Sequence, residues 1–198
     1  GETGDIRWIT QGGKSTLEGL SDPSRLKWDR GTHLVYQQGT LFGIRADKSG
    51  VIAWDAETGM VRWERSLGGI AQDVLGCQGG KLFVSGTRLW GVDIETGRII
   101  WQIGSRDVEL QSFGRGLLSE TQILWPTREE LLCIDQETGT LHRRMPLQAV
   151  WNLTGGNLGW GHGILLIAQT QKLTAIPLFR GVKSTRDVEV SLDARGIP

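Results

Sequence analysis

The sequence predicts an all-β fold of about four repeated four-stranded sheets, on three observations. First, Asp55, Asp93 and Asp135 each open a copy of the segment D-x-E-T-G, so that copies stand 38 and 42 residues apart. Second, short apolar or alternating runs of strand length surround every copy, and no 12-residue window shows a helical apolar stripe. Third, Gly accounts for 29 of 198 residues and Pro for only 5, a composition that favours many tight turns.

The predicted strands follow in groups of four, bounded by Gly, Ser, Asn and Thr. The first three groups comprise residues 32–38, 40–46, 51–55 and 60–66; 73–77, 81–85, 89–93 and 98–103; and 114–118, 122–126, 130–135 and 140–145. The fourth comprises residues 158–162, 164–169 and 172–176, with 182–190 as the candidate for its last strand. This fourth copy is degenerate, because it keeps Ala175 and Gly181 but has Pro177 in place of the Asp.

A further trace of the repeat stands at the start of the chain. Glu2–Trp8 aligns with Glu57–Trp63, so the chain opens inside a repeat. We expect residues 1–11 to form the outer strand of a preceding or closing sheet and 12–31 an inserted connector, with its one helix candidate at 22–28. Residues 32–181 then hold the four sheets, and 182–198 the last outer strand and a tail.

The chemistry of the repeated segment is that of a hairpin turn. The Asp carboxylate accepts backbone N–H bonds two residues on, as in an Asx turn, the Thr hydroxyl can do the same more weakly, and Gly takes the positive φ that closes the hairpin. A Trp four residues after the Gly lies on the outer strand, where its indole can cover the neighbouring sheet. Repetition at every hairpin favours this interpretation over paired catalytic carboxylates or a Ca²⁺ site. The predicted docking residues are Trp8, Asp55, Thr58, Gly59, Trp63, Asp93, Thr96, Gly97, Trp101, Asp135, Thr138 and Gly139.

These residues resemble the repeat of the PQQ-like (quinoprotein alcohol dehydrogenase-like) β-propeller family, whose tryptophan-docking motif is A-x-D-x-x-T-G-x-x-x-W. The match is complete from Ala53 to Trp63 and lacks only the Ala in the second copy. In the third copy Arg143 replaces the Trp. The resemblance implies four-stranded propeller blades, about four in this chain, within a larger ring of seven or eight.

The family has two branches, and the resemblance favours the non-catalytic one. The repeats are most similar to those of the outer-membrane-assembly-type scaffolds. This resemblance implies a protein-binding module that has no cofactor and is located in the cell envelope or periplasm. The alternative is part of a PQQ-dependent dehydrogenase or a quinone-binding relative using PQQ and calcium. The catalytic alcohol dehydrogenases carry an adjacent Cys-Cys pair, whereas Cys77 and Cys133 are 56 residues apart here. A small lectin-like, ligand-binding propeller is the third possibility.

Four blades leave sheet edges and faces uncovered, so we expect a protein partner or self-association to close the propeller. The ring closes through another chain, a second copy or a further part of the same chain. A compact four-blade ring, in which Thr3–Thr10 completes the last sheet, is the other arrangement considered.

Composition and motifs exclude several other classes. Lys plus Arg and Asp plus Glu both total 22, so no basic excess favours nucleic acid or an anionic membrane surface. The longest uncharged run, 145–171, is interrupted by polar residues and glycines, and we expect no membrane span. Two cysteines are too few for a disulfide scaffold or a four-cysteine metal site.

No catalytic, cofactor-binding or metal-ligating residue is predicted. Gly12–Ser15 resembles the end of a phosphate loop, but Trp8 stands where that loop needs Gly. The three histidines lack metal-ligand spacing. The candidates for partner or funnel contacts are Arg143, which we expect on a more polar seam, and Trp160 and His162, which alternate with Gly and so are expected to point the same way.

Overall fold

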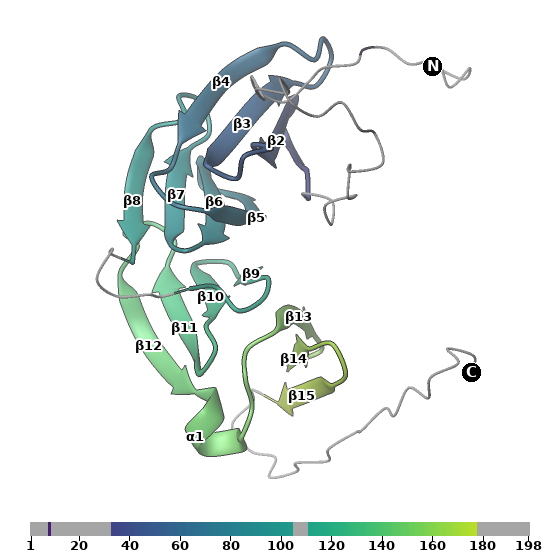
Figure 1. Cartoon of the computed structure of the whole chain (residues 1–198), viewed down its shortest axis with the longest axis vertical. Helices are drawn as coiled ribbons and strands as arrows, with labels where there is room; N and C mark the ends of the chain where they lie inside the picture. Colours follow the sequence, from purple (N-terminus) through teal and green to yellow (C-terminus); the bar gives the residue numbers. More distant parts are fainter. Residues whose placement is uncertain (1–7, 9–32, 105–110, 178–198) are drawn as a thin grey trace, which may run out of the picture. The chain divides into compact units, whose positions relative to one another are not determined.

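A computed structural model describes residue 8 and residues 33–104 and 111–177 of the 198-residue chain. The chain divides into two compact units, Gly1–Leu110 and Gln111–Pro198, which are taken one at a time below. Within the described residues the structure is almost all-β, with fifteen strands and one short helix (Figure 1). The predicted fold class is confirmed.

Unit one contains two antiparallel four-stranded sheets, each with its strands in sequence order. Blade one consists of β1 (Val35–Gln37), β2 (Thr40–Ile44), β3 (Gly50–Asp55) and β4 (Val61–Ser66). Blade two consists of β5 (Ala71–Gln78), β6 (Lys81–Gly86), β7 (Leu89–Asp93) and β8 (Ile99–Ile103). Inner and outer strands differ in burial. The inner strand β6 of blade two is buried throughout, whereas the outer strand β4 of blade one exposes five of its six residues.

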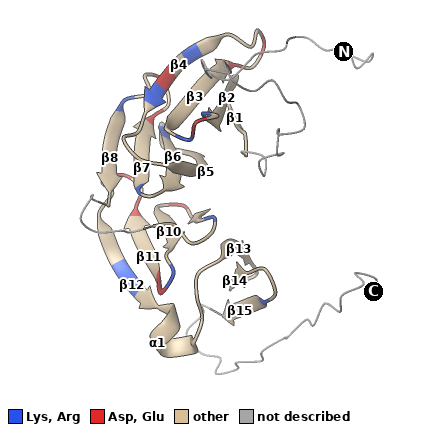
Figure 2. Cartoon of the chain, viewed as in Figure 1, with Lys and Arg blue, Asp and Glu red and all other residues tan. Residues whose placement is uncertain are grey.

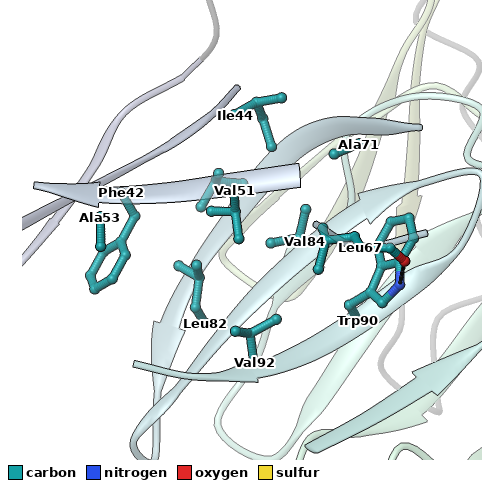
Figure 3. Packing of buried hydrophobic residues seen from close by; sticks show 11 residues of the cluster. Phe42, Ile44, Val51, Ala53, Leu67, Ala71, Leu82, Val84, Trp90 and Val92 are labelled. Carbon is teal, nitrogen blue, oxygen red and sulfur yellow. Dashed lines mark hydrogen bonds between the residues drawn. The ribbon is translucent and has the colours of Figure 1, made fainter. Parts of the chain in front are cut away.

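The core of unit one lies between its two blades. Apolar side chains of β2 and β3 form one buried cluster with side chains of β6 and β7 (Figure 3). The Trp90 indole lies in this cluster, and its Nε1 donates a hydrogen bond to the Leu67 carbonyl oxygen at 3.1 Å. Four-stranded sheets that pack on one another through such a cluster are the blades of a propeller.

Unit two contains a four-stranded and a three-stranded antiparallel sheet, again in sequence order. Blade three consists of β9 (Leu117–Leu118), β10 (Gln122–Pro126), β11 (Glu130–Asp135) and β12 (Leu141–Pro146). The three-stranded sheet, which we call blade four, consists of β13 (Asn157–Gly161), β14 (Ile164–Ala168) and β15 (Leu173–Pro177). One face of blade four shares a buried cluster with blade three, which includes Leu131, Leu165 and Ile167.

The fifteen strands start and end within three residues of their predicted bounds. Three predicted segments lie outside the described residues. They are the last strand, 182–190, the connector 12–31 with its helix candidate, and all but Trp8 of the outer strand predicted at 1–11. Strand β9 is shorter than predicted, and Gly114, where the predicted strand begins, has a φ of 113°, which is outside the range of a strand.

Helix α1 (Leu147–Trp151) was not predicted from the sequence. It links β12 to blade four and ends at Asn152, whose φ is 52°. Only Leu147 of its five residues is buried, so the helix has no apolar periodicity that a sequence window could detect.

Candidate functional site

The three D-x-E-T-G segments form the same turn. The Asp55 Oδ1 accepts the Thr58 backbone N–H at 2.8 Å and the Thr58 hydroxyl at 2.9 Å. The Gly59 N–H donates to the Asp55 carbonyl oxygen at 2.8 Å, and Gly59 has φ 72°. The turns that begin at Asp93 and Asp135 repeat these contacts within about 0.2 Å.

The turns also hold the pKa of their carboxyl groups below the usual range. For Asp55 the largest cause is the hydrogen bond from the Arg62 guanidinium, followed by the Thr58 bonds. For Asp93 the hydrogen bonds from Thr96 dominate, and for Asp135 those from Thr138. These bonds stabilise the ionised form, which suits a turn and not a general acid.

Tryptophans from outer strands lie over two of these turns. The Trp63 indole of β4 covers the turn of blade two: its Nε1 donates to the Ile94 carbonyl oxygen at 2.9 Å, and a Cβ on Gly97 would lie 2.6 Å from the ring. Trp8 covers the turn of blade one in the same manner. Its Nε1 donates to the Ala56 carbonyl oxygen at 3.1 Å, and a Cβ on Gly59 would lie 2.6 Å from the ring. In each turn, therefore, the Gly satisfies the backbone and also leaves room for an indole.

Trp63 and Trp101 also have a small residue opposite them in their own blades. Ala53 of β3 pairs across the sheet with Trp63, and Gly91 of β7 pairs with Trp101. A Cβ on Gly91 would lie 2.4 Å from the Trp101 ring. The small residue two positions before the Asp is thus explained by the space that the indole needs. The sequence contains this signal, but its cross-strand cause becomes visible only with the register.

A β-bulge follows this pair in every four-stranded blade that has the turn. The residue just before the docking position is the extra one, and in blade one it is Arg62. Its guanidinium bonds the Asp55 Oδ2 at 2.7 Å and the Thr40 hydroxyl at 2.8 Å. In blade three His142 lies in the same place, 3.6 Å from the Asp135 Oδ2. Sequence reasoning missed this contact, since without the bulge Arg62 would not be expected to face its own turn.

Strand β4 makes a second tie to blade two, which the sequence did not indicate. The Arg65 Nε donates to the Gly97 carbonyl oxygen at 2.7 Å. Trp63 and Arg65 are two residues apart, and the alternation of a strand puts them on one face. Together they hold the turn of blade two at the Ile94 and Gly97 carbonyl groups.

The predicted partner or funnel residues lie in two blades of unit two. Arg143 is exposed on β12, where it pairs across the sheet with Cys133 and takes the position of a docking tryptophan. Trp160 is 50% exposed on β13. His162 has φ 48° and lies in the turn between β13 and β14, so it does not continue the alternation that was expected from the flanking glycines.

The two cysteines do not form the adjacent pair that the catalytic alcohol dehydrogenases carry. The two cysteines are free thiols on separate strands, Cys77 on β5 and Cys133 on β11. Burial raises the pKa of the Cys77 thiol to about 12 and also raises that of Cys133. Over residues 33–104 and 111–177, no three His, Cys, Asp or Glu side chains gather as a metal site would require. The Asp carboxylates of the turns are occupied by hydrogen bonds.

None of the helices in the described part of the chain is long and apolar enough to cross a membrane.

Comparison with known proteins gives the same fold. The crystal structure of BamB from Moraxella catarrhalis superposes with a TM-score of 0.59 and 19% identity, over 74% of this chain and 46% of that one. Two quinohemoprotein alcohol dehydrogenases also match. ADHIIG from Pseudomonas putida HK5 has a TM-score of 0.56 and 16% identity, over 68% of this chain and 27% of its own. The enzyme from Comamonas testosteroni has a TM-score of 0.53 and 17% identity, over 69% of this chain and 28% of its own.

These likenesses establish propeller blades, and the chain spans less than half the length of each of these structures. No curated protein matches the sequence. The family model described as outer membrane protein assembly factor BamB matches residues 1–193, almost the whole sequence. With its repeated turns, its docked tryptophans and this match, the chain belongs to the BamB family of PQQ-like repeat propellers.

Proposed function

We propose that this protein is a non-catalytic scaffold of the cell envelope, which binds a protein partner of the outer-membrane assembly machinery. The proposal takes its setting from the family, whose description names an outer membrane protein assembly factor. The observation that carries it in this chain is a set of exposed large side chains on segments of unit two that backbone hydrogen bonds join. We call this the link surface and define it by Phe113, Arg128, Val150 and Trp151.

The link surface is built where chain segments pass between strands. Phe113 precedes β9, Arg128 lies in the turn between β10 and β11, and Val150 and Trp151 belong to α1 (Figure 1). Backbone bonds hold these segments together. The Phe113 N–H donates to the Pro126 carbonyl at 2.8 Å, the Gln148 N–H to Glu129 at 3.1 Å and the Gly155 N–H to Arg128 at 3.1 Å.

The side chains of this surface are of the kind that protein partners bury. Phe113 is 44% exposed, Val150 58% and Trp151 37%, and Arg128 is also exposed. Aromatic residues and Arg are enriched at the centres of protein interfaces, where each can contribute more than 1 kcal/mol. The turns with D-x-E-T-G present Glu and Thr in place of such side chains, so we assign partner binding to the link surface.

Site-specific photo-crosslinking tests this proposal. A photoreactive residue at Trp151 should capture an outer-membrane assembly protein from envelope preparations, identified by mass spectrometry. The same residue at Met60, which is 70% exposed beside a D-x-E-T-G turn, is the matched control and should not capture it. Equal capture at both positions, or capture of no assembly protein at Trp151, would contradict the proposal.

The proposal includes no cofactor, and a titration separates it from the dehydrogenase alternative. PQQ added with calcium to the protein should leave the quinone absorbance unchanged. A saturable red shift of that absorbance would instead assign the chain to the quinone-binding branch.

A further inference from the structure

Each described blade carries a cation in the turn between its second and third strands, which we call the middle turn. These cations are Lys48, Arg88, Arg128 and Lys172, which stand 40, 40 and 44 residues apart, and none of the four residues is buried. In blade four, Lys172 is the one Lys, Arg, Asp or Glu within residues 157–177, and Figure 2 shows this blade in tan apart from the turn before β15. The fourth copy thus keeps the cation although it lacks the Asp of the repeated segment.

The two ends of a blade differ in charge. The third strand of a blade begins at the middle turn and leads to the D-x-E-T-G turn, so the two turns lie at opposite ends of that strand. Each D-x-E-T-G segment contains two carboxylates and no Lys or Arg. The middle turns comprise residues 45–49, 87–88, 127–129 and 169–172. They contain five Lys or Arg residues and two carboxylates, Asp47 and Glu129, and Asp47 is bonded by Arg45 and Ser49. A carboxylate of a partner is therefore attracted to the middle turns and repelled by the other end.

In unit one, the link between β4 and β5 is bonded to the middle turns of both blades. The Ala71 N–H donates to the Lys48 carbonyl oxygen at 2.8 Å, and the Thr87 N–H donates to the Ile70 carbonyl oxygen at 2.9 Å. These bonds fix the backbone of Ile70, whose side chain is 53% exposed. An exposed apolar side chain on a fixed backbone loses little conformational entropy when a partner covers it. We call Lys48, Ile70 and Arg88 the unit-one link surface.

Unit two repeats this arrangement at the link between β12 and β13, which carries Trp151. The Gly155 N–H donates to the Arg128 carbonyl oxygen at 3.1 Å, and the Gln169 Nε2, from the middle turn of Lys172, donates to the Gly155 carbonyl oxygen at 3.1 Å. In each unit, therefore, a link with an exposed apolar side chain is bonded to two turns that each carry a cation. Over residues 33–104 and 111–177, neither Arg128 nor Lys172 forms an ion pair.

The cation of blade two is likewise close to a neutral group. The Arg88 Nη1 lies 3.4 Å from the Gln102 Oε1, which is a weak contact that a carboxylate can replace.

We propose that the unit-one link surface is a second binding site, and that both link surfaces bind a protein segment with Asp or Glu on either side of a large apolar residue. This inference rests on the proposed function of the link surface and names the chemistry of the segment that it binds. The apolar residue of the segment packs on Ile70 in unit one and on Trp151 in unit two. Its carboxylates pair with the cations of the two middle turns, which fixes the position of the segment.

The number and surroundings of the cations favour a protein segment over an anionic lipid surface. Lipid-binding clusters gather about four to eight Lys or Arg residues. Each link surface has a cation in each of two turns, with Asp47 or Glu129 in one of them, and the whole chain has a formal net charge of zero. Two separate cations suit two carboxylates of one segment.

Photo-crosslinking of a defined peptide to the full chain tests this proposal. The probe is a biotinylated synthetic peptide that repeats Asp-Leu-Glu, and the comparison peptide has Lys in place of every Asp and Glu. A photoreactive residue at Ile70, or at Trp151, should capture the acidic peptide about fivefold more than the Lys peptide. The same residue at Met60 is the matched control, because Met60 is exposed beside a D-x-E-T-G turn, and it should capture little of the acidic peptide.

Charge reversal at the two ends of blade two gives the second readout. Arg88→Glu should lower the capture of the acidic peptide at Ile70 about fivefold, because it turns an attraction into a repulsion. Arg98→Glu makes the same change of charge directly after the D-x-E-T-G segment of that blade and should leave this capture within about twofold. Lys172→Glu should lower capture at Trp151 and not at Ile70. Circular dichroism checks that each variant keeps its β-sheet content.

Equal capture of the two peptides at Ile70, or equal losses with Arg88→Glu and Arg98→Glu, would overturn the proposal. So would binding of phosphatidylglycerol vesicles that depends on Arg88 while the acidic peptide is not captured, since the surface would then bind lipid. The two proposals fail separately. Capture of an assembly protein at Trp151 without peptide discrimination at Ile70 would leave the proposed function standing alone, and the reverse pattern would leave the acidic-segment site alone.

Discussion

Blade two and blade four begin alike and end differently. In both, three antiparallel strands follow one another in sequence order, although β6 is buried throughout and β14 buries only Leu165 and Ile167. In blade two the third strand ends at Asp93, whose N–H and carboxylate build the turn that receives Trp63. In blade four the third strand ends at Pro177, and the described sheet stops there. The difference teaches that the Asp at the end of the third strand, which blade four lacks, builds the turn that binds the indole in blade two.

Replacing Asp93 by Pro and Pro177 by Asp should give the largest difference in the free energy of unfolding. Asp93→Pro removes the hydrogen bond to Arg98 and the bonds to Thr96, and we expect it to lower the free energy of unfolding by about 2 to 4 kcal/mol. Pro177→Asp should change it by less than about 0.5 kcal/mol, because the exposed Pro177 makes none of these bonds. Urea denaturation measures both values, and similar losses would mean that the two strand ends are equivalent.

The contact between Trp63 and the blade two turn can be isolated with two glycines. Gly97 and Gly68 have nearly the same φ, 69° and 65°, but only Gly97 lies under an indole, whereas a Cβ on Gly68 meets nothing within 4 Å. Gly68→Ala should cost about 1 kcal/mol for the left-handed backbone. Gly97→Ala should cost about 2 to 3 kcal/mol because Trp63 must also move. Equal costs would indicate that the indole does not depend on the turn.

Removal of the hydrogen bond from Arg65 of β4 to blade two should lower the free energy of unfolding by less. Arg65→Ala loses the hydrogen bond to the Gly97 carbonyl, and we expect a loss of about 0.5 to 1 kcal/mol because the side chain is exposed. Arg65→Lys keeps the charge but not the Nε donor. If both variants unfold at the same urea concentration as the unsubstituted chain, Trp63 alone holds the turn.

Acid stability should show the smallest difference. The folded pKa of Asp93 and Asp135 is lowered below the ordinary 3.8, so the unfolded chain binds protons more readily than the folded one. Their stabilising contribution is therefore complete above pH 3.8 and is lost as the pH falls through the folded values. Asp93→Asn should be less stable at pH 7 and should lose less stability on acidification below pH 3.8. An unchanged pH slope would show that Thr96 does not stabilise the carboxylate.

Much of the fold follows from the sequence because each turn has local chemistry. Asp55, Thr58 and Gly59 lie close together in sequence, so their pattern alone predicts the hairpin and the strands on either side. The partner of Trp63 was predictable only as a neighbouring repeat. The bonds of its indole to Ile94 and of Arg65 to Gly97 depend on how two sheets pack, which no local pattern encodes.

The remaining differences arise where local signals are ambiguous. Glycines on both sides of His162 fit an alternating strand as well as a turn, and the positive φ of His162 decides for the turn. The place of Arg62 depends on a bulge, which shifts the register by one residue and is invisible in the alternation of β4. Helix α1 buries a single side chain and therefore leaves no period to detect.

The central claim is that the D-x-E-T-G turn binds the tryptophan of the neighbouring blade. A double-mutant cycle between Trp63 and Asp93 tests this claim most directly. Trp63→Ala, Asp93→Ala and the double variant would be unfolded in urea under one set of conditions. We expect a coupling energy of about 1 kcal/mol or more, because loss of the turn displaces the Ile94 carbonyl and the Gly97 surface that the indole uses. A coupling energy of zero would contradict the claim, since turn and tryptophan would then contribute independently.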